Sequence, residues 1–132
     1  MEFGYRKLVV YTKATDYVQY VYSLLKKFPE EEKYGLCSQL RRASVSITSN
    51  IAEGVSRYSS KDKIHFMEIA FGSLMETMSQ LEIANKLYYI TNEELTAAEN
   101  KASEISKLLT NLQYSFLPKD KNGQISNKPI NS

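Results

Sequence analysis

The chain has 132 residues, of which 42% are hydrophobic and 24% are charged, and this composition excludes a wholly disordered protein. One domain of this length can bury a core without disulfides or metals, and the single cysteine, Cys37, excludes an intrachain disulfide. A formal net charge of +2 is too small to identify a nucleic-acid-binding domain by itself. No apolar run is long enough for a membrane span or a signal peptide, so we expect a cytoplasmic protein with no membrane partner.

Four segments of the chain carry apolar residues at alternating spacings of three and four. This period of about 3.5 residues is typical of helices that pack against one another, and strands cannot produce it. The expected helices span about residues 8–28, 34–56, 60–89 and 92–116. We therefore predict an all-α protein, an antiparallel up-down four-helix bundle over residues 1–117. The polar segment 118–132 contains two prolines and is expected to be a disordered tail.

Local signals mark where three of these helices begin. The run Glu30–Glu32 precedes the second helix, where carboxylates oppose the positive end of the helix dipole. Ser59 with Asp62, and Thr91 with Glu94, have the spacing of capping boxes at the third and fourth helices.

The second and third expected helices carry apolar residues on two faces rather than one. A four-helix bundle buries one stripe per helix, and a monomer rarely leaves a second stripe in water. We therefore expect the protein to associate with itself through these helices, although the pattern does not give the number of subunits. The competing interpretation is that the third helix lies deeper in the bundle than the others. The expected interface consists of Val45, Ala52, Val55, Phe66, Ile69, Ile83, Leu87 and Ile90.

Residues 40–54 combine helical spacing with small and polar side chains. Asn50 and Gly54 fall on the inner stripe, where leucine would be expected. Because glycine destabilises a helix interior by about 1 kcal/mol, either the helix ends near Gly54 or another backbone approaches it, with Gly72 and Ser73 as the matching small residues. We predict a polar network that fixes helix pairing, with a ligand or partner site as the alternative. Its members are Asn50, Glu53, Gly54, Ser73 and Glu76, with Arg42 as a further partner.

The chain carries no set of residues typical of an active site. His65 is the single histidine and forms one His-x-x-Glu pair with Glu68, whereas metal sites in bundles and zinc sites need more ligands. Cys37 has no histidine near it in the sequence, and no glycine-rich phosphate loop is present. We therefore expect a protein that is not an enzyme and that uses no cofactor or metal.

Several motifs in the second and third helices point to a known family. They are Gln39-Leu40-Arg41-Arg42-Ala43, Asn50-Ile51-Ala52-Glu53-Gly54 and Ala70-Phe71-Gly72-Ser73. Over about residues 5–117 the chain resembles the four-helix-bundle proteins encoded in intervening sequences of bacterial 23S rRNA genes, a family often labelled ribosomal. The resemblance implies a ring-like homo-oligomer, most simply a homopentamer. The family also looks like the accessory protein of diversity-generating retroelements, a basic pentamer that binds nucleic acid and a reverse transcriptase.

Two functions remain open on this basis. The first is binding of RNA or DNA through basic residues repeated around the ring, which contact phosphates while an aromatic side chain stacks on a base. The candidate residues are Arg41, Arg42, Arg57, Tyr58, Lys61 and Lys63. The alternative is a scaffold or adaptor for a reverse-transcriptase-like or other protein partner, without direct contact to nucleic acid. Convergence of the basic residues on one open surface would favour the first function, and their pairing with carboxylates would favour the second.

Overall fold

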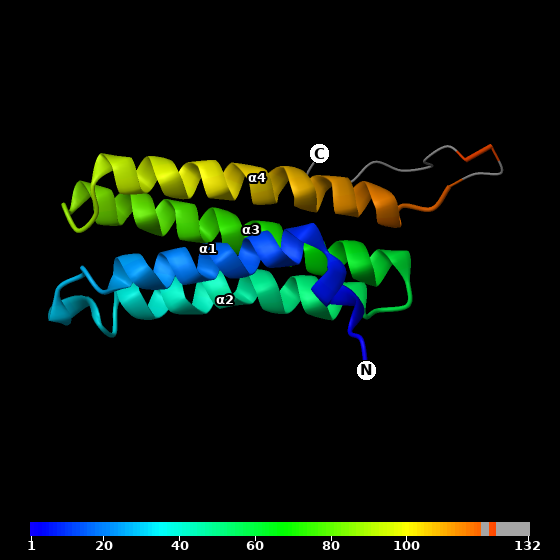
Figure 1. The fold of residues 1–132 in the computed structure, drawn as a ribbon, viewed down its shortest axis with the longest axis horizontal. Coiled ribbons are helices and arrows are strands. Elements are labelled where there is room, and N and C mark those ends of the chain that lie inside the picture. The colour runs from blue at the N-terminus through cyan, green and yellow to red at the C-terminus, as the bar shows by residue number, and fades with distance from the viewer. Residues whose placement is uncertain (120–121, 124–132) are drawn as a thin grey trace.

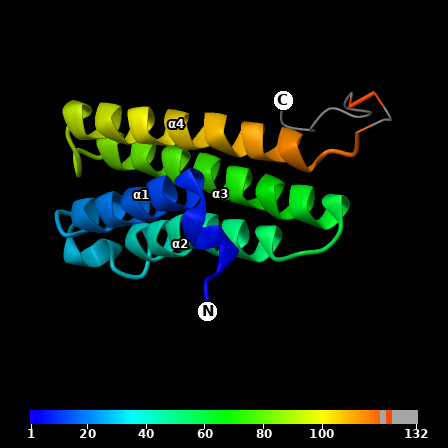
Figure 2. The same cartoon turned by 45° about the vertical axis from the view of Figure 1, so that its right-hand side comes forward.

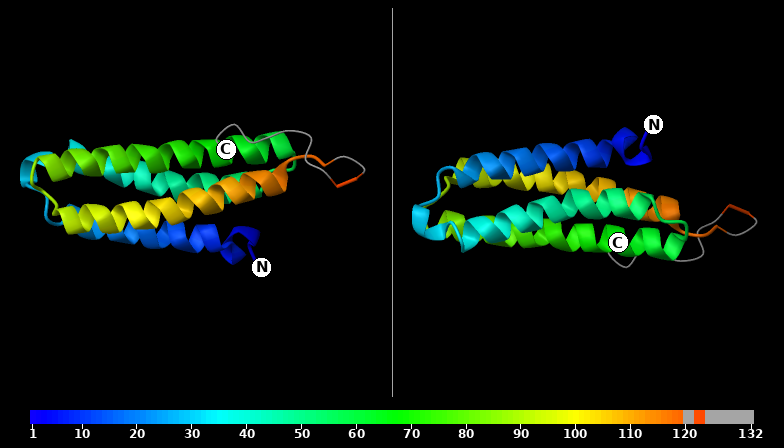
Figure 3. Two further views of the ribbon diagram at one scale, coloured as in Figure 1. Left: turned by 90° about the horizontal axis from the view of Figure 1, so that it is seen from above. Right: turned by 90° about the horizontal axis from the view of Figure 1, so that it is seen from below.

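A computed structural model describes residues 1–119 and 122–123, so most of the predicted tail over 118–132 lies outside the described residues. Within them the protein is all-α. Its elements are the 3-10 helices η1 (Gly4–Lys7) and η2 (Glu30–Glu32) and the α-helices α1 (Val9–Leu25), α2 (Leu36–Val55), α3 (Ser60–Lys86) and α4 (Asn92–Phe116). Each α-helix packs against two others (Figures 1 and 3). Helices α2 and α4 each contact both α1 and α3, so α1 and α3 lie diagonally across the bundle.

Short loops join the helices at the two ends of the bundle. The loops after α1 and α3 lie at one end, and the loop after α2 lies at the other (Figure 1). The N-terminal η1 packs against α1 and α2 (Figure 2). Among the described helices, none is both long enough and apolar enough to cross a membrane.

The helix ends differ from the expected bounds by one to three residues where tertiary contacts intervene. Helix α1 stops at Leu25 rather than at Phe28, whose ring is buried and packs against Tyr89 with centroids 5.3 Å apart. Residues 30–32 form η2, and α2 therefore begins at Leu36, where the Glu32 carboxylate accepts a hydrogen bond from the Leu36 amide. This contact satisfies an amide that the first turn of a helix leaves unpaired.

The two predicted capping boxes are present to different degrees. At α4 both halves form, because the Thr91 hydroxyl accepts from the Glu94 amide and the Glu94 carboxylate accepts from the Thr91 amide. At α3 the Ser59 hydroxyl accepts from the Asp62 amide, which is one half of the box. Lys27 adds an ion pair to Glu94, and this pair, followed by the amide of Thr91, holds the pKa of the Glu94 carboxyl below its ordinary value.

The core follows the predicted period on each helix. On α2 the buried stripe passes through Leu40, Ile47, Ile51 and Gly54, so Asn50, expected on the inner stripe, lies beside it and is half-buried. The buried residues of α3 are Met67, Ala70, Leu74, Thr77, Gln80, Leu81 and Ala84. Tyr88 is 93% exposed in the turn that follows this helix.

Helix α3 approaches α2 closely at Gly54. A Cβ at this position would lie 2.5 Å from Met67 Cε and 2.7 Å from Phe66 Cβ, which is closer than van der Waals contact allows. Both alternatives predicted for Gly54 therefore hold, because α2 ends at Val55 and α3 approaches Gly54 closely, but the expected partner at Gly72 is wrong. A Cβ at Gly72 would have no atom within 4 Å, because Gly72 lies on the exposed side of α3.

Candidate nucleic-acid interface

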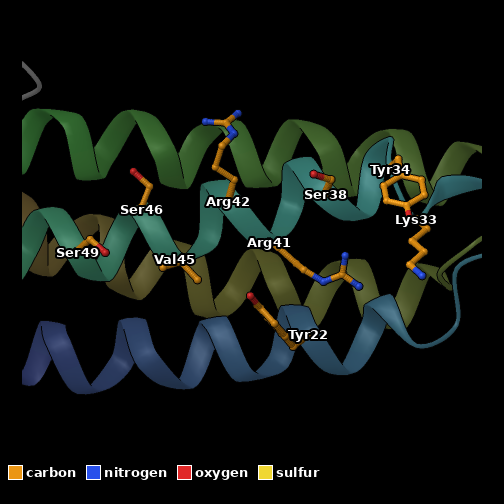
Figure 4. Close-up of a pocket in the computed structure, with 9 residues that line it drawn as sticks. All are labelled: Tyr22, Lys33, Tyr34, Ser38, Arg41, Arg42, Val45, Ser46 and Ser49. Atoms are coloured by element: carbon orange, nitrogen blue, oxygen red, sulfur yellow. The ribbon is translucent and has the colours of Figure 1, made fainter.

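An open groove runs along the outer side of α2, beside the C-terminal half of α1 (Figure 4). Its volume is about 710 Å³. The described residues that line it include three cations and no carboxylate. They are Tyr22, Lys33, Tyr34, Ser38, Arg41, Arg42, Val45, Ser46 and Ser49. A surface whose lining offers cations, hydroxyl groups and aromatic rings but no carboxylate has the chemistry of a phosphate-bearing ligand site.

The two arginines of the groove point to opposite sides of α2. The Arg41 side chain extends toward Tyr22 on α1, whereas Arg42 extends toward α3 (Figure 4). Arg42 forms an ion pair with Glu76 on α3, at 3.4 Å between Nη2 and Oε2. Arg41 is exposed, and within the part of the chain that the structure describes it makes no ion pair. Arg41 is therefore more available to an external anion than Arg42 is.

The segment before α2 contributes a second cation and an aromatic ring to the groove. The Lys33 ammonium lies 5.6 Å from the centroid of the Tyr34 ring, within the range of a cation–π contact. The Tyr34 side chain is 88% exposed, and Tyr22 across the groove is 40% exposed. Both rings are thus open to solvent on the same side of the molecule as Arg41.

The other four predicted nucleic-acid-binding residues lie elsewhere, around the loop between α2 and α3. They are Arg57, Tyr58, Lys61 and Lys63. Arg57 pairs with Glu53 and covers the Phe66 ring at 4.8 Å, and Lys63 donates a hydrogen bond to the Val55 carbonyl. Tyr58 is fully exposed at this loop. Since Arg41 and Val55 are separated by about 21 Å along α2, the six predicted residues do not form one surface.

The predicted polar network exists in part and is divided into separate contacts. Ser46 links α2 to α3 through a 2.9 Å contact between its hydroxyl and that of Ser73, and Asn50 donates to the Ser46 carbonyl and hydroxyl. Glu76 pairs with Arg42 as expected. Glu53 takes part in neither contact, because it forms an ion pair with Arg57, one turn further along the chain. The network therefore stabilises the α2–α3 pair.

Most of the residues that we expect at a self-association surface are exposed or half-buried in the subunit. Val45, Ile69, Ile83 and Leu87 are between 38% and 48% exposed. Ala52, Val55 and Phe66 are half-buried. Ile90 is 3% exposed and belongs to the core of the subunit, so its assignment to the interface is wrong. The reason is that α3 ends at Lys86, and the following turn carries Ile90 back into the bundle.

The side chains with potential for catalysis remain isolated from one another. His65 is exposed on α3 beside the Phe66 ring. Cys37 is buried, and this burial raises the pKa of its thiol, which disfavours the reactive thiolate. Among residues 1–119 and 122–123, no three His, Cys, Asp or Glu side chains gather in a way that could hold a metal ion.

Most of the groove was not predicted from the sequence, because three separate segments form it. Arg41 and Arg42 were identified, but Lys33 and Tyr34 precede α2, and Tyr22 belongs to α1. The available signal was the Lys33-Tyr34 dipeptide, which precedes Arg41 and Arg42 by only a few residues in the sequence. Only the packing of α1 against α2 brings Tyr22 to this cluster (Figure 4).

Comparison with known proteins identifies a family and a similar solved structure. Residues 6–111 match the family described as 23S rRNA-intervening sequence protein. A crystal structure of a protein of unknown function from the S23 ribosomal protein family of Bacteroides thetaiotaomicron is similar, with a TM-score of 0.73 and 30% sequence identity. The match covers 80% of this chain and 98% of that one. A comparison with curated proteins gives no match.

Proposed function

The chain belongs to the 23S rRNA-intervening sequence protein family, and we propose that it is a non-catalytic protein that binds nucleic acid as a homo-oligomer. One observation carries this proposal: the groove along α2 holds Lys33, Arg41 and Arg42 without a carboxylate among the described residues that line it. Cations on an open surface bind phosphates in a sequence-tolerant and salt-sensitive way. The nearby Glu76 engages Arg42 and leaves Arg41 and Lys33 available.

Self-association supports binding by adding copies of the groove. Each subunit has a formal net charge of +2, so a ring of subunits, with five as the number implied by the family resemblance, multiplies both charge and contact points. Linked sites raise the overall affinity without any new contact within a subunit. The exposed apolar side chains Ile69, Ile83 and Leu87, which lie outside the groove, provide the surface for this assembly.

The test is equilibrium binding of a labelled structured RNA and a DNA duplex across a salt series, after light scattering has fixed the mass of the protein. We expect binding that weakens steeply with salt. The double variant Lys33→Ala/Arg41→Ala should bind more weakly, and the slope of log K against log salt should fall by about 0.7 to 0.9 for each phosphate that the variant no longer neutralises. The matched control removes two exposed cations outside the groove, at Lys86 and Lys107. An equally large weakening in the control, or no binding by the intact oligomer at low salt, would contradict the proposal.

A second candidate function is a scaffold for a protein partner, with a reverse-transcriptase-like protein as one such partner. It is favoured by the internal engagement of three of the five predicted basic residues. Arg42 and Arg57 pair with glutamates, and Lys63 bonds to a backbone carbonyl. An intact oligomer that binds no nucleic acid at low salt would support the scaffold.

A further inference from the structure

We propose that the groove along α2 binds a single strand of nucleic acid in preference to a duplex, with Tyr34 stacking on an unpaired base. This inference rests on the proposed function, and it names the class of ligand that the same site selects. It depends on aromatic rings that lie beside the cations. Binding of phosphates alone would require the cations but not the rings.

The Tyr34 ring is open to solvent on most of its surface. It is 88% exposed, and the Lys33 ammonium lies 5.6 Å from the ring centroid. Because so little of the apolar area of Tyr34 is buried, this side chain adds little to the stability of the folded subunit. Its open surface can accept a base, because every nucleobase has a π face that stacks on an aromatic ring.

Aromatic rings and cations both line the groove. Tyr34 and Lys33 lie at one end, and Arg41 extends from α2 toward Tyr22 on α1 (Figure 4). Single-strand sites combine cations that follow the backbone with aromatic rings that hold successive bases. In a duplex the bases already stack on one another, so Tyr34 and Tyr22 have nothing to stack on without unpairing them.

No acid among the described residues that line the groove competes for its cations. The polar groups there, other than the cations, are the hydroxyls of serines and tyrosines. Ser38 and Ser49 are exposed and can donate to phosphate or sugar oxygens. A peptide helix with acidic side chains would also be attracted to the cations, but it would leave the two exposed tyrosines without a π partner.

The test compares a labelled twelve-nucleotide single strand, as RNA and as DNA, with the duplex made from the same sequence. The intact protein should bind the single strand about tenfold or more tightly than the duplex. Tyr34→Ala should weaken single-strand binding by about 5- to 100-fold and leave duplex binding nearly unchanged. Tyr34→Phe should retain the preference, because phenylalanine keeps the ring. The RNA and DNA arms show whether the sugar contributes.

The control is Tyr88, a tyrosine of similar exposure outside the groove, which is 93% exposed after α3. Tyr88→Ala should bind the single strand as the unmodified protein does. Light scattering on each variant checks that the assembly is intact, and a change of mass in Tyr34→Ala would overturn the inference by assigning Tyr34 to a subunit contact.

The inference and the proposed function fail in different ways. Equal or tighter binding of the duplex, or an unchanged single-strand affinity in Tyr34→Ala, would overturn the inference. If Lys33→Ala/Arg41→Ala still weakened duplex binding in that case, the proposed function would stand. Failure of the unmodified oligomer to bind any nucleic acid would overturn both, and would point to a protein ligand for the groove.

Discussion

The hydroxyls of Tyr17 on α1 and Thr77 on α3 lie 2.9 Å apart in the centre of the bundle, and they join two helices on opposite sides of it. Thr77 donates its proton to the Leu74 carbonyl at 2.6 Å, so the Tyr17 hydroxyl is the donor between the pair. Both side chains are fully buried. Burial raises the pKa of Tyr17 to about 12, because a charged phenolate would lose its hydration in the core.

Tyr17→Phe should lower the free energy of unfolding by about 1 kcal/mol at neutral pH, because it removes the hydrogen bond to Thr77. The contribution of the neutral Tyr17 is fully present below pH 10, its ordinary pKa, and is lost as pH rises through about 12. The advantage of the unmodified protein over Tyr17→Phe should therefore shrink across this interval. Urea unfolding at about pH 8 and about pH 11.5, on either side of the ordinary pKa, measures it. A constant difference would contradict the buried hydrogen bond.

Gly54→Ala should destabilise the protein by about 1 to 3 kcal/mol, because the new methyl group would overlap Met67 and Phe66 on α3. Gly72→Ala is the matched control. Its methyl group meets no atom within 4 Å, and alanine should stabilise the helix by about 0.5 to 1 kcal/mol. Thermal unfolding of both variants tests the pair, and equal effects would show that α3 does not approach Gly54 closely.

Tyr88→Gly should raise the free energy of unfolding by about 1 kcal/mol. Tyr88 follows α3 with φ at 64°, and it is the one described non-glycine residue with a positive φ. The amides of Tyr88 and Tyr89 bond to the carbonyls of Asn85 and Ala84, in the helix-ending motif that favours glycine. Tyr58→Gly, in a loop without a positive φ, should not raise stability. Reduced stability in Tyr88→Gly would mean that the exposed ring makes a stabilising contact in the assembled protein.

Ile83→Glu should reduce the mass of the assembly measured by light scattering while each subunit remains folded. The Ile83 side chain is 48% exposed in the subunit, so the fold of the subunit should tolerate a charge there. The charge should be unfavourable only where a second subunit covers this position. Val9→Glu, at a 61% exposed position on α1, is the control and should leave the mass unchanged. An Ile83→Glu protein of unaltered mass would remove this residue from the interface.

Phe66 gives a less clear test of the same surface, because its ring lies under the Arg57 guanidinium and its Cβ is close to Gly54. A charge at this position would disturb the α2–α3 packing within one subunit. A change of mass in Phe66→Glu would therefore not separate unfolding from dissociation.

Local sequence determined the helices and several of their ends. Apolar residues that recur at alternating spacings of three and four residues predicted the four helices correctly. That spacing puts the side chains on one side of an α-helix, whatever surrounds the helix. The capping box of Thr91 and Glu94 depends on residues three apart, and it forms as expected. The small residue Gly54 likewise indicated a close approach, since glycine inside a helix is costly unless a neighbour requires the space.

Tertiary structure decided which groups face each other across helices. The sequence offers α3 two apolar stripes, and only the packing of α2 and α4 shows that Gln80 and Ile90 are buried while Ile69 and Ile83 are exposed. The charge of Arg41 and Arg42 is the same in the sequence, yet α3 supplies Glu76 to Arg42 and leaves Arg41 beside Tyr22. These outcomes depend on distances between segments far apart in the chain, which side-chain packing sets and which no local pattern contains.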